Sequence, residues 1–354
     1  MERVESVLRL LSRHHFDAIL IHSPINLYYL TGLHLSRGYL LLTLEKRILW
    51  VDPRYKEVAQ ALSSDVEIFC HASAIETYLS IGATVAQVKG RVGFDASTMS
   101  VEVFQAIGSQ TSVEKLVPAP ALFSELRRPK RAEEIASIEE ACRLCEQGFQ
   151  HIRGLFREGI TERELSQQLK AFWFAHGAEA LSFEPIIAFG AHTACPHWSC
   201  SSTPLHAPSP ILIDIGVQLH SYQSDMTRTL FFGEPDPELL KCHTLVQEAY
   251  ELAFSEARPG VAPHHLDSLV RQFFSQNGFP NSFLHGLGHG VGLEVHEAPR
   301  ISAYATDELP FQVGDVIAIE PGLYLPGRGG IRIENTVVIE AAGARSLIGE
   351  STYL

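Results

Sequence analysis

Short apolar runs recur through the first part of the chain, separated by polar or helix-forming stretches. The runs are rich in β-branched and aromatic residues, and each has about the length of one strand. They read DAILIHS (17–23), GYLLLTL (38–44), RILWVD (47–52), VEIFCH (66–71) and RVGFDAS (91–97). Strands that alternate with helical stretches in this way predict an α/β layer.

This alternation stops at a proline-rich stretch, LVPAPALFSELRRPKRAEE (116–134). Clustered prolines are typical of loops and boundaries, so we place a boundary near residue 124. It separates an N-terminal α/β domain (1–124) from a second domain (125–354). Near its end, just before a predicted helix, the stretch contains a basic cluster that we expect to be a solvated linker; its members are Arg127, Arg128, Lys130 and Arg131.

The second domain contains an internal duplication. The segment REGITERELSQQLKAFWFAHG (157–177) aligns without gaps to RPGVAPHHLDSLVRQFFSQNG (258–278). In each copy the pattern predicts a long helix, a turn, and a second helix closed by a glycine at its C-terminal end. Thr161 and Glu164 have the spacing of a capping box at the start of that second helix in the first copy. A repeat of this kind predicts two related halves.

Acidic strand-like runs follow the same repeat. IDIG around Asp214 corresponds to IEPG around Glu320, and SDMT around Asp225 corresponds to IENT around Glu334. The four carboxylates therefore form two pseudo-symmetric pairs. We expect two related halves that face each other across a curved sheet and place these acids at a shared axis.

Strand geometry predicts where the neighbouring side chains point, because successive residues alternate faces. Ile213 and Ile215 should point away from Asp214. By the same logic Ile333 lies on the face opposite Glu334, and Arg332 lies on the same face as Glu334.

Buried carboxylates need a partner, because a charged group in an apolar segment is costly unless it is paired or binds a metal. One such residue is often a satisfied structural Asp, whereas four of them indicate a shared site. The stretch NSFLHGLGHGVGLEVHE (281–297) adds His285, His289 and His296 among closely spaced glycines. By itself this stretch also fits a flexible loop with solvated histidines. Oxygen-rich sites with one nitrogen suit Mn, Co, Fe or Zn, and bridging carboxylates suit two ions.

Composition narrows the class of protein. The 354 residues are sufficient for two domains, and the net charge of -13 argues against a nucleic-acid partner. No apolar run has the length of a membrane span, and the N-terminal MERVESVLRLL resembles an amphipathic helix more than a signal peptide. Six cysteines are too few for a disulfide scaffold, and Cys142 and Cys145 are interpreted as core thiols. These features favour a cytoplasmic protein.

Several motifs together resemble the metallopeptidase family of pita-bread fold, which includes prolidase, aminopeptidase P, methionine aminopeptidase and the metal-free creatinase. They are HGLGHGVGLEVHE, EPGLY, GIRIEN, and an Asp that is separated from DMTRT by ten intervening residues. SPINLYYLTG and VDPRY also resemble the N-terminal domain of the prolidase and aminopeptidase P branch. The resemblance covers essentially the whole chain and implies an α/β N-terminal domain plus an α+β pita-bread C-terminal domain with internal pseudo-twofold duplication.

The resemblance also implies roles for individual residues. All five metal ligands of the family are present, which argues against a creatinase-like, metal-free relative; they are Asp214, Asp225, His289, Glu320 and Glu334. His197 matches the substrate-side histidine of the first half, and His285 and His296 match the two histidines that flank the ligand His289. Arg332 matches the arginine before the last ligand. Arg300 matches a position that meets the substrate carboxylate in prolidase-like members. His192, His264 and His265 are interpreted as structural or surface residues.

Two positions depart from the family pattern. Asn335 stands where many members have Asp, and Val217–His220 replaces a smaller turn that usually contains Tyr. Neither belongs to the ligand set, so we expect both to tune activity without abolishing it.

The implied chemistry is hydrolysis by a hydroxide held between two divalent ions, with Mn as first choice and Co, Zn or Fe as alternatives. Glu320 is the candidate for the proton from the water. His285 and His296 would donate to the developing oxyanion, and His197 would hold the scissile group. For His197 and His296 the alternative is ordinary structural hydrogen bonding. For Arg332 we favour orientation of a neighbouring carboxylate.

The implied substrate is a small peptide with proline at its second position, cut as an Xaa-Pro aminopeptidase or an Xaa-Pro dipeptidase. The implied assembly is a homodimer, with the N-terminal domain restricting the substrate and making dimer contacts. Two alternatives are an amidohydrolase of other specificity and a non-catalytic pita-bread interaction module. Bound metal would favour an enzyme over the module.

Overall fold

The computed structural model describes residues 2–62 and 65–349. Its contacts divide the chain into two units, the first ending at Arg127 and the second beginning at Arg128. No helix in these described ranges combines the length and apolarity of a bilayer span.

A six-stranded sheet forms the centre of the N-terminal unit, in the order β4-β3-β2-β1-β5-β6. Strands β1, β2 and β3 pair antiparallel, and the other pairings are parallel. All five predicted runs form strands; their bounds are β1 Ala18–Ile21, β2 Gly38–Thr43, β3 Arg47–Val51, β4 Val66–Cys70 and β5 Val92–Phe94. The edge strand β6 (Leu116–Pro118) was missed, because its proline resembled a breaker and edge strands tolerate proline.

Helices cover this sheet, and the predicted N-terminal amphipathic helix is confirmed. One core of the unit joins Trp50 and Phe94 of the strands to Ile81 of α4. Asn26, Leu27 and Tyr29 of α2 are buried, so SPINLYYLTG packs. The helices are α1 Glu2–Arg13, α2 Pro24–Thr31, α3 Lys56–Gln60, α4 Ala74–Gln87, α5 Val101–Gly108 and α6 Pro120–Glu125.

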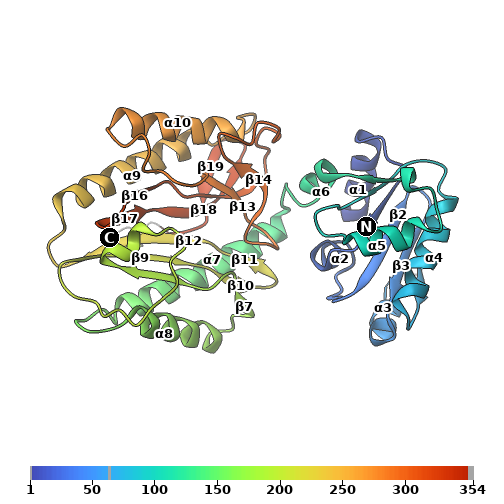
Figure 1. Cartoon of the computed structure of the whole chain (residues 1–354), viewed down its shortest axis with the longest axis horizontal. Coiled ribbons are helices and arrows are strands. Elements are labelled where there is room, and N and C mark those ends of the chain that lie inside the picture. Colours follow the sequence, from blue (N-terminus) through green and yellow to red (C-terminus); the bar gives the residue numbers. More distant parts are fainter. Residues whose placement is uncertain (1, 63–64, 350–354) are drawn as a thin grey trace. The chain divides into compact units, whose positions relative to one another are not determined.

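The C-terminal unit contains the two predicted helix pairs. They are α7 Ala132–Arg153 with α8 Glu162–Ala175, and α9 Pro237–Glu256 with α10 Pro263–Gln276. Gly177 and Gly278 end the second helices at φ +94° and +93°, a backbone conformation that favours glycine. Thr161 and Glu164 form the predicted capping box. In Figure 1, α8 borders the strands of this unit on one side, and α9 and α10 border them on the other.

One large sheet joins the two halves, in the order β14-β13-β15-β18-β12-β9-β8, with β19 also paired to β18. Read outward from the central β12–β18 pair, β9 and β8 on one side correspond to β15 and β13 on the other. Strands β12 and β18 pair antiparallel, in a register that places Thr227 opposite Glu334. The bounds are β8 Ile186–Phe189, β9 Ser209–Ile215, β12 Met226–Phe232, β13 Gly288–Gly290, β14 Glu297–Ile301, β15 Val316–Ile319, β18 Glu334–Glu340 and β19 Gly343–Ser346.

Two smaller sheets flank this one, in the orders β11-β10-β7 and β16-β17. Their strands are β7 Ala180–Leu181, β10 Val217–Leu219, β11 Tyr222–Gln223, β16 Gly322–Leu325 and β17 Gly329–Arg332. As the alternation predicted, Ile333 packs into the core beneath α9 and α10 together with Ile317 and Ile319.

The prediction of a fully solvated basic linker is wrong for two of its four residues. Arg128 pairs with Asp315 at 2.9 Å, and Lys130 pairs with Glu297 at 2.7 Å, all with buried side chains. The backbone NH of Lys130 also donates to the carbonyl of Gly314 at 2.7 Å. The partners lie far away in the sequence, so local charge and proline content did not reveal them.

The interpretation of Cys142 and Cys145 as core thiols is confirmed. Both lie on α7, both are buried, and neither forms a disulfide. Burial raises the pKa of each thiol, which favours the neutral form.

Candidate metal centre

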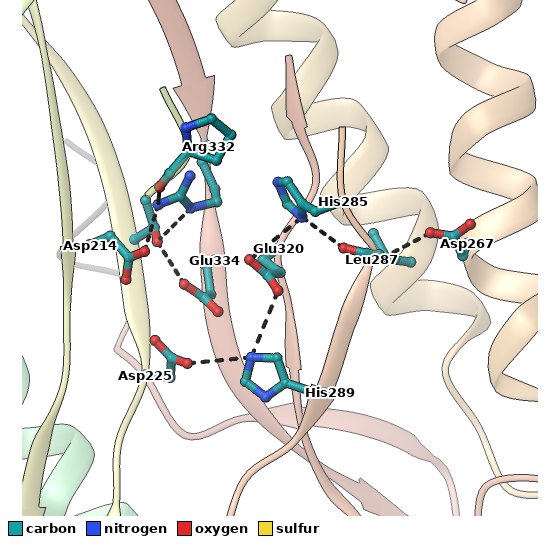
Figure 2. A network of polar contacts seen from close by, with 12 residues as sticks. Asp214, Asp225, Asp267, His285, Leu287, His289, Glu320, Arg332 and Glu334 are labelled. Carbon is teal, nitrogen blue, oxygen red and sulfur yellow. Dashed lines mark hydrogen bonds and ion pairs between the residues drawn. The ribbon is translucent and has the colours of Figure 1, made fainter. Parts of the chain in front are cut away.

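The four acidic side chains reach the sheet axis from equivalent places in the two halves. Asp214 is the penultimate residue of β9, and Asp225 directly precedes β12. Glu320 directly follows β15, and Glu334 begins β18. The central β12–β18 pairing brings these separate segments together, and all four acids line one cavity (Figure 2).

His289 reaches the same place from the middle of β13. Its Nδ1 lies 3.1 Å from the carbonyl of Gly290, which makes Nδ1–H the donor and leaves Nε2 free to accept. Nε2 lies 3.6 Å from Asp225 and 3.7 Å from Glu320. A Cβ at Gly288 would stand 2.0 Å from the carbonyl oxygen of Ala318, so glycine is needed for this strand to approach so closely.

The described protein groups around this acidic cluster only partly compensate its negative charge. Removal from water and then the neighbouring Glu334 raise the pKa of Asp225 and of Glu320. Burial and then Asp214 raise the pKa of Glu334 to about 8. Oδ1 of Asp214 is buried and has no hydrogen-bond partner within the described part of the chain. A cation would relieve all four conditions at once.

The donor set fits a divalent metal. Ligand atoms of Asp225, His289 and Glu334 all lie within 4.8 Å of one another. Four carboxylates and one imidazole are the donors preferred by ions such as Mn, Co, Fe and Zn. The residues present are therefore compatible with metal binding.

Arg332 is hydrogen-bonded to the acidic cluster and its surroundings. Its guanidinium donates to Asp214 Oδ2 at 2.5 Å and to the hydroxyl of Thr227 at 3.2 Å. That hydroxyl in turn donates to Glu334 Oε2 at 2.6 Å. Because Arg332 is only 2% exposed and already has these partners, its arrangement is that of a residue that orients carboxylates.

His285 has a protein partner at each ring nitrogen. Nδ1 lies 2.8 Å from the carbonyl of Gly286, and Nε2 lies 2.7 Å from the hydroxyl of Tyr324. The same hydroxyl accepts from Arg332 at 2.7 Å. A continuous chain therefore runs from Arg332 through Tyr324 to His285. Burial, followed by the charge of Arg332, lowers the pKa of His285 to about 3, so the ring is neutral.

Sequence reasoning did not single out Thr227 or Tyr324. Thr227 lies inside DMTRT and Tyr324 inside EPGLY, so both were quoted in motifs without a role. The available signal was a polar side chain in a strand next to a motif acid, and strand alternation places Thr227 on the same face as Asp225. The departure at Asn335 is also accounted for locally, since its side-chain oxygen accepts from Arg228 at 2.7 Å.

The acids and histidines open onto a cavity of about 310 Å³. His197, His285 and His296 line it, as does Arg332, and the apolar wall consists of Phe183, Ile186 and Pro196. Burial lowers the pKa of His296, whose ring contacts that of His289 edge-on.

Arg300 is not among the residues that line this cavity. It is exposed on β14, and its backbone NH donates to Glu308 at 3.1 Å. His192, in contrast, is tied to a buried carboxylate, Glu162, at 2.8 Å, in agreement with a structural role.

Sequence profiles of two protein families match the chain. The profile described as metallopeptidase family M24 matches residues 136–341, and that of the creatinase/prolidase N-terminal domain matches residues 3–128. Among curated proteins, an Xaa-Pro dipeptidase of Pyrococcus furiosus is 33% identical over 347 residues, covering 98% of this chain and 97% of that protein.

Solved structures share the whole architecture. The prolidase from Pyrococcus horikoshii has a TM-score of 0.90 and 31% identity, with 99% of this chain and 98% of that chain covered. An X-Pro aminopeptidase from Thermotoga maritima has a TM-score of 0.83 and 32% identity, with coverages of 96% and 97%. The expected fold, a creatinase-type N-terminal domain followed by a pita-bread domain, is thereby confirmed.

Proposed function

The chain belongs to metallopeptidase family M24, and on that premise we propose that it hydrolyses the bond between an N-terminal residue and a following proline in short peptides. The family uses divalent metals, and we propose two ions here, with Mn first and Co, Zn or Fe as alternatives. The observation that carries the proposal is the convergence of four carboxylates and one imidazole on a cavity with an apolar wall.

The proposed ligands of the two ions are Asp214, Asp225, His289, Glu320 and Glu334. Arg332 and Thr227 would hold Asp214 and Glu334 in place, as their hydrogen bonds already do. When bound, such ions ionise a water at neutral pH and polarise the scissile carbonyl.

Proton transfer is assigned to Glu320. One of its oxygens faces His289, while Oε2 lies 3.8 Å from His285 and is the oxygen we propose to carry the proton to the leaving amine. His296 and His197 line the cavity, and we propose that they contact the substrate carbonyl and the scissile group. His285 remains a proposed catalytic residue, although donation to substrate requires one of its present partners to be exchanged.

The apolar wall of the cavity suits the pyrrolidine ring and an apolar first residue. An Xaa-Pro nitrogen carries no hydrogen, so a site that needs no N–H contact suits this bond. Relatives named as a dipeptidase and as an aminopeptidase are similarly close to the chain, and both modes lie within the proposal. Arg300 remains a proposed contact for a substrate carboxylate.

The decisive experiment is hydrolysis of Gly-Pro, a tripeptide with proline second, and Gly-Ala by protein reconstituted with Mn. We expect cleavage of at least one proline peptide and little of Gly-Ala. Asp225→Asn should lose about a hundredfold or more in kcat/KM, since it removes a charge at the proposed centre. A metal-replete protein that cleaves neither proline peptide would exclude the proposed substrate class.

We further propose a cytoplasmic homodimer in which the N-terminal unit restricts substrate length. The unpaired thiols suit a reducing compartment. Light scattering after size-exclusion chromatography should give twice the chain mass of 39.2 kDa, whereas a single-chain mass would contradict the dimer.

A further inference from the structure

The first residue of α8, Glu162, is a fully buried carboxylate outside the acidic cluster. Within the described ranges, no lysine or arginine pairs with it. Burial would raise the pKa of Glu162, but hydrogen bonds led by that from His192 outweigh burial and lower it. Five donors satisfy its two oxygens: the backbone NH of Phe189 (2.9 Å), Nδ1 of His192 (2.8 Å), Nε1 of Trp198 (2.9 Å), and the backbone NH (2.8 Å) and hydroxyl (2.7 Å) of Ser201.

These donors bracket one segment, 189–201, which contains His197. After the short 3-10 turn Gly190–Ala194, the segment has no helix or strand to hold it. The side chain of His197 is exposed at the cavity and has no hydrogen-bond partner among the described residues. Its place is therefore set by the backbone on either side and not by its own contacts.

Both neighbours of His197 are held. Trp198 donates to Glu162, stacks on His192 with ring centroids 3.8 Å apart, and packs against strand residues of β8 and β9. On the other side, the carbonyl of Pro196 accepts from Arg332 at 3.4 Å. Glu162 thus holds one side of His197, and the guanidinium that orients Asp214 holds the other.

The second half uses a similar anchor at a different position. Asp267 on α10 is fully buried and accepts from the backbone NH of Leu287 and of Ala303, each at 2.9 Å. In the duplication Asp267 aligns with Ser166, one helical turn after Glu162. The two anchors are therefore not equivalent copies, yet each fixes the loop that brings a histidine to the cavity.

We propose that Glu162 is a positioning residue that fixes the segment 189–201 so that His197 faces the cavity. Its catalytic consequence rests on the proposed peptidase function, but the anchoring itself does not. Both oxygens of the Glu162 carboxylate accept hydrogen bonds. Replacement by Gln would turn one of these acceptors into an NH₂ group, which would face N–H or O–H donors and could not accept from them.

Amide hydrogen exchange on the full chain tests the anchoring. In Glu162→Gln we expect exchange within 187–203 to be about tenfold faster or more, while 284–297 is unchanged. Glu164→Gln is the matched control: the same change two residues along, at an exposed position where Gln also completes a capping box. It should leave both segments as in the wild type.

A milder variant guards against misfolding. Trp198→Phe removes one donor to Glu162 and keeps a ring that can stack, so it should speed exchange in 187–203 to a smaller extent. Unchanged exchange in this segment in both Glu162→Gln and Trp198→Phe would overturn the proposal.

A double-mutant cycle tests the coupling to His197. With the proline peptide that the wild type cleaves best, Glu162→Gln should lower kcat/KM about ten- to a hundredfold. In a His197→Ala background the same change should cost no more than about twofold, because its effect acts through that histidine. Bound metal per chain should stay at the wild-type value.

Losses that multiply in the double variant would reduce Glu162 to a general stabiliser and overturn its positioning role. An inactive wild type would instead defeat the proposed function, and the exchange measurement would still decide whether Glu162 anchors the segment.

Discussion

At the scale of single residues, the centre concentrates negative charge that protein groups only partly offset. Among the lysines and arginines that the structure describes, Arg332 is in direct contact with an acid of the cluster, and it pairs with Asp214. The pKa of Asp225, Glu320 and Glu334 is raised, mainly by burial. In the metal-free protein these three carboxyls should therefore remain protonated at pH values at which ordinary carboxyls are already ionised.

This charge gives a stability prediction for the metal-free protein. The folded pKa of Glu334, about 8, exceeds the ordinary value of 4.5, so the folded state binds the proton more tightly than the unfolded state. The resulting stability is present below the ordinary value and is lost as the pH rises toward 8. We would measure urea unfolding of the chelator-treated protein at pH values between 4.5 and about 8. The unfolding free energy should fall less steeply with rising pH in Glu334→Gln than in the wild type. Equal slopes would contradict the assignment.

Tyr324 gives a second prediction at this scale. Tyr324→Phe removes the hydroxyl that links Arg332 to His285 and leaves the ring in place. We expect a loss of about 1–3 kcal/mol in unfolding free energy, because the buried Arg332 and the half-buried His285 each lose a hydrogen bond. kcat/KM should fall while bound metal is retained. Tyr304→Phe is the control, since that side chain is exposed, and a comparable loss there would argue against a specific role.

At the scale of elements, the second helix of each half acts as a support for a loop. Arg271 of α10 pairs with Asp267 and also donates to the carbonyls of Phe283 and His285. Asp267 accepts a hydrogen bond from the backbone NH of Leu287, which lies two residues before the proposed ligand His289 (Figure 2). This helix therefore fixes the entry into β13.

Asp267→Asn should weaken metal binding without touching a ligand. Loss of the carboxylate loosens the segment before His289, and changes in such supporting groups typically cost about 10–100-fold in metal affinity. Isothermal titration calorimetry with Mn would measure this loss of metal affinity. Ser268→Ala, which alters an exposed residue bonded only to its own helix, should bind as the wild type does. Wild-type affinity in Asp267→Asn would show that α10 is not needed to hold the loop for metal.

At the scale of the whole molecule, the proposed centre belongs to one unit. All thirteen residues that line the cavity lie after Arg128, and the N-terminal unit has its own core. Metal should thus stabilise the C-terminal unit selectively, because a ligand stabilises the folded state that binds it.

Chelation should reveal this selectivity. Removing metal is expected to speed amide exchange in β9, β12, β15 and β18, where the acids lie, and to leave β1, β2 and β3 unchanged. Restoring Mn should reverse the effect. Equal acceleration in both sheets would show that the two units respond together.

Much of the fold was predictable because its signals are local and repeated. Five of six strands of the N-terminal sheet followed from apolar runs, and the pairs α7–α8 and α9–α10 followed from the duplicated pattern. The edge strand β6 was missed because Pro118 masked it. For the site, the repeat placed Asp214 with Glu320 and Asp225 with Glu334 in equivalent positions, and the structure brings all four to one cavity.

The sequence by itself determined the element pattern, the duplication and the set of acids, because periodicity and repetition survive without knowledge of contacts. Tertiary structure alone decided which charges are satisfied and by what. Arg128 finds Asp315 at a separation of 187 residues, and Arg332 reaches Thr227 across 105. Glu162 collects donors from a segment that follows it by 27 to 39 residues. Such partners are chosen by packing in space, so no local pattern encodes them.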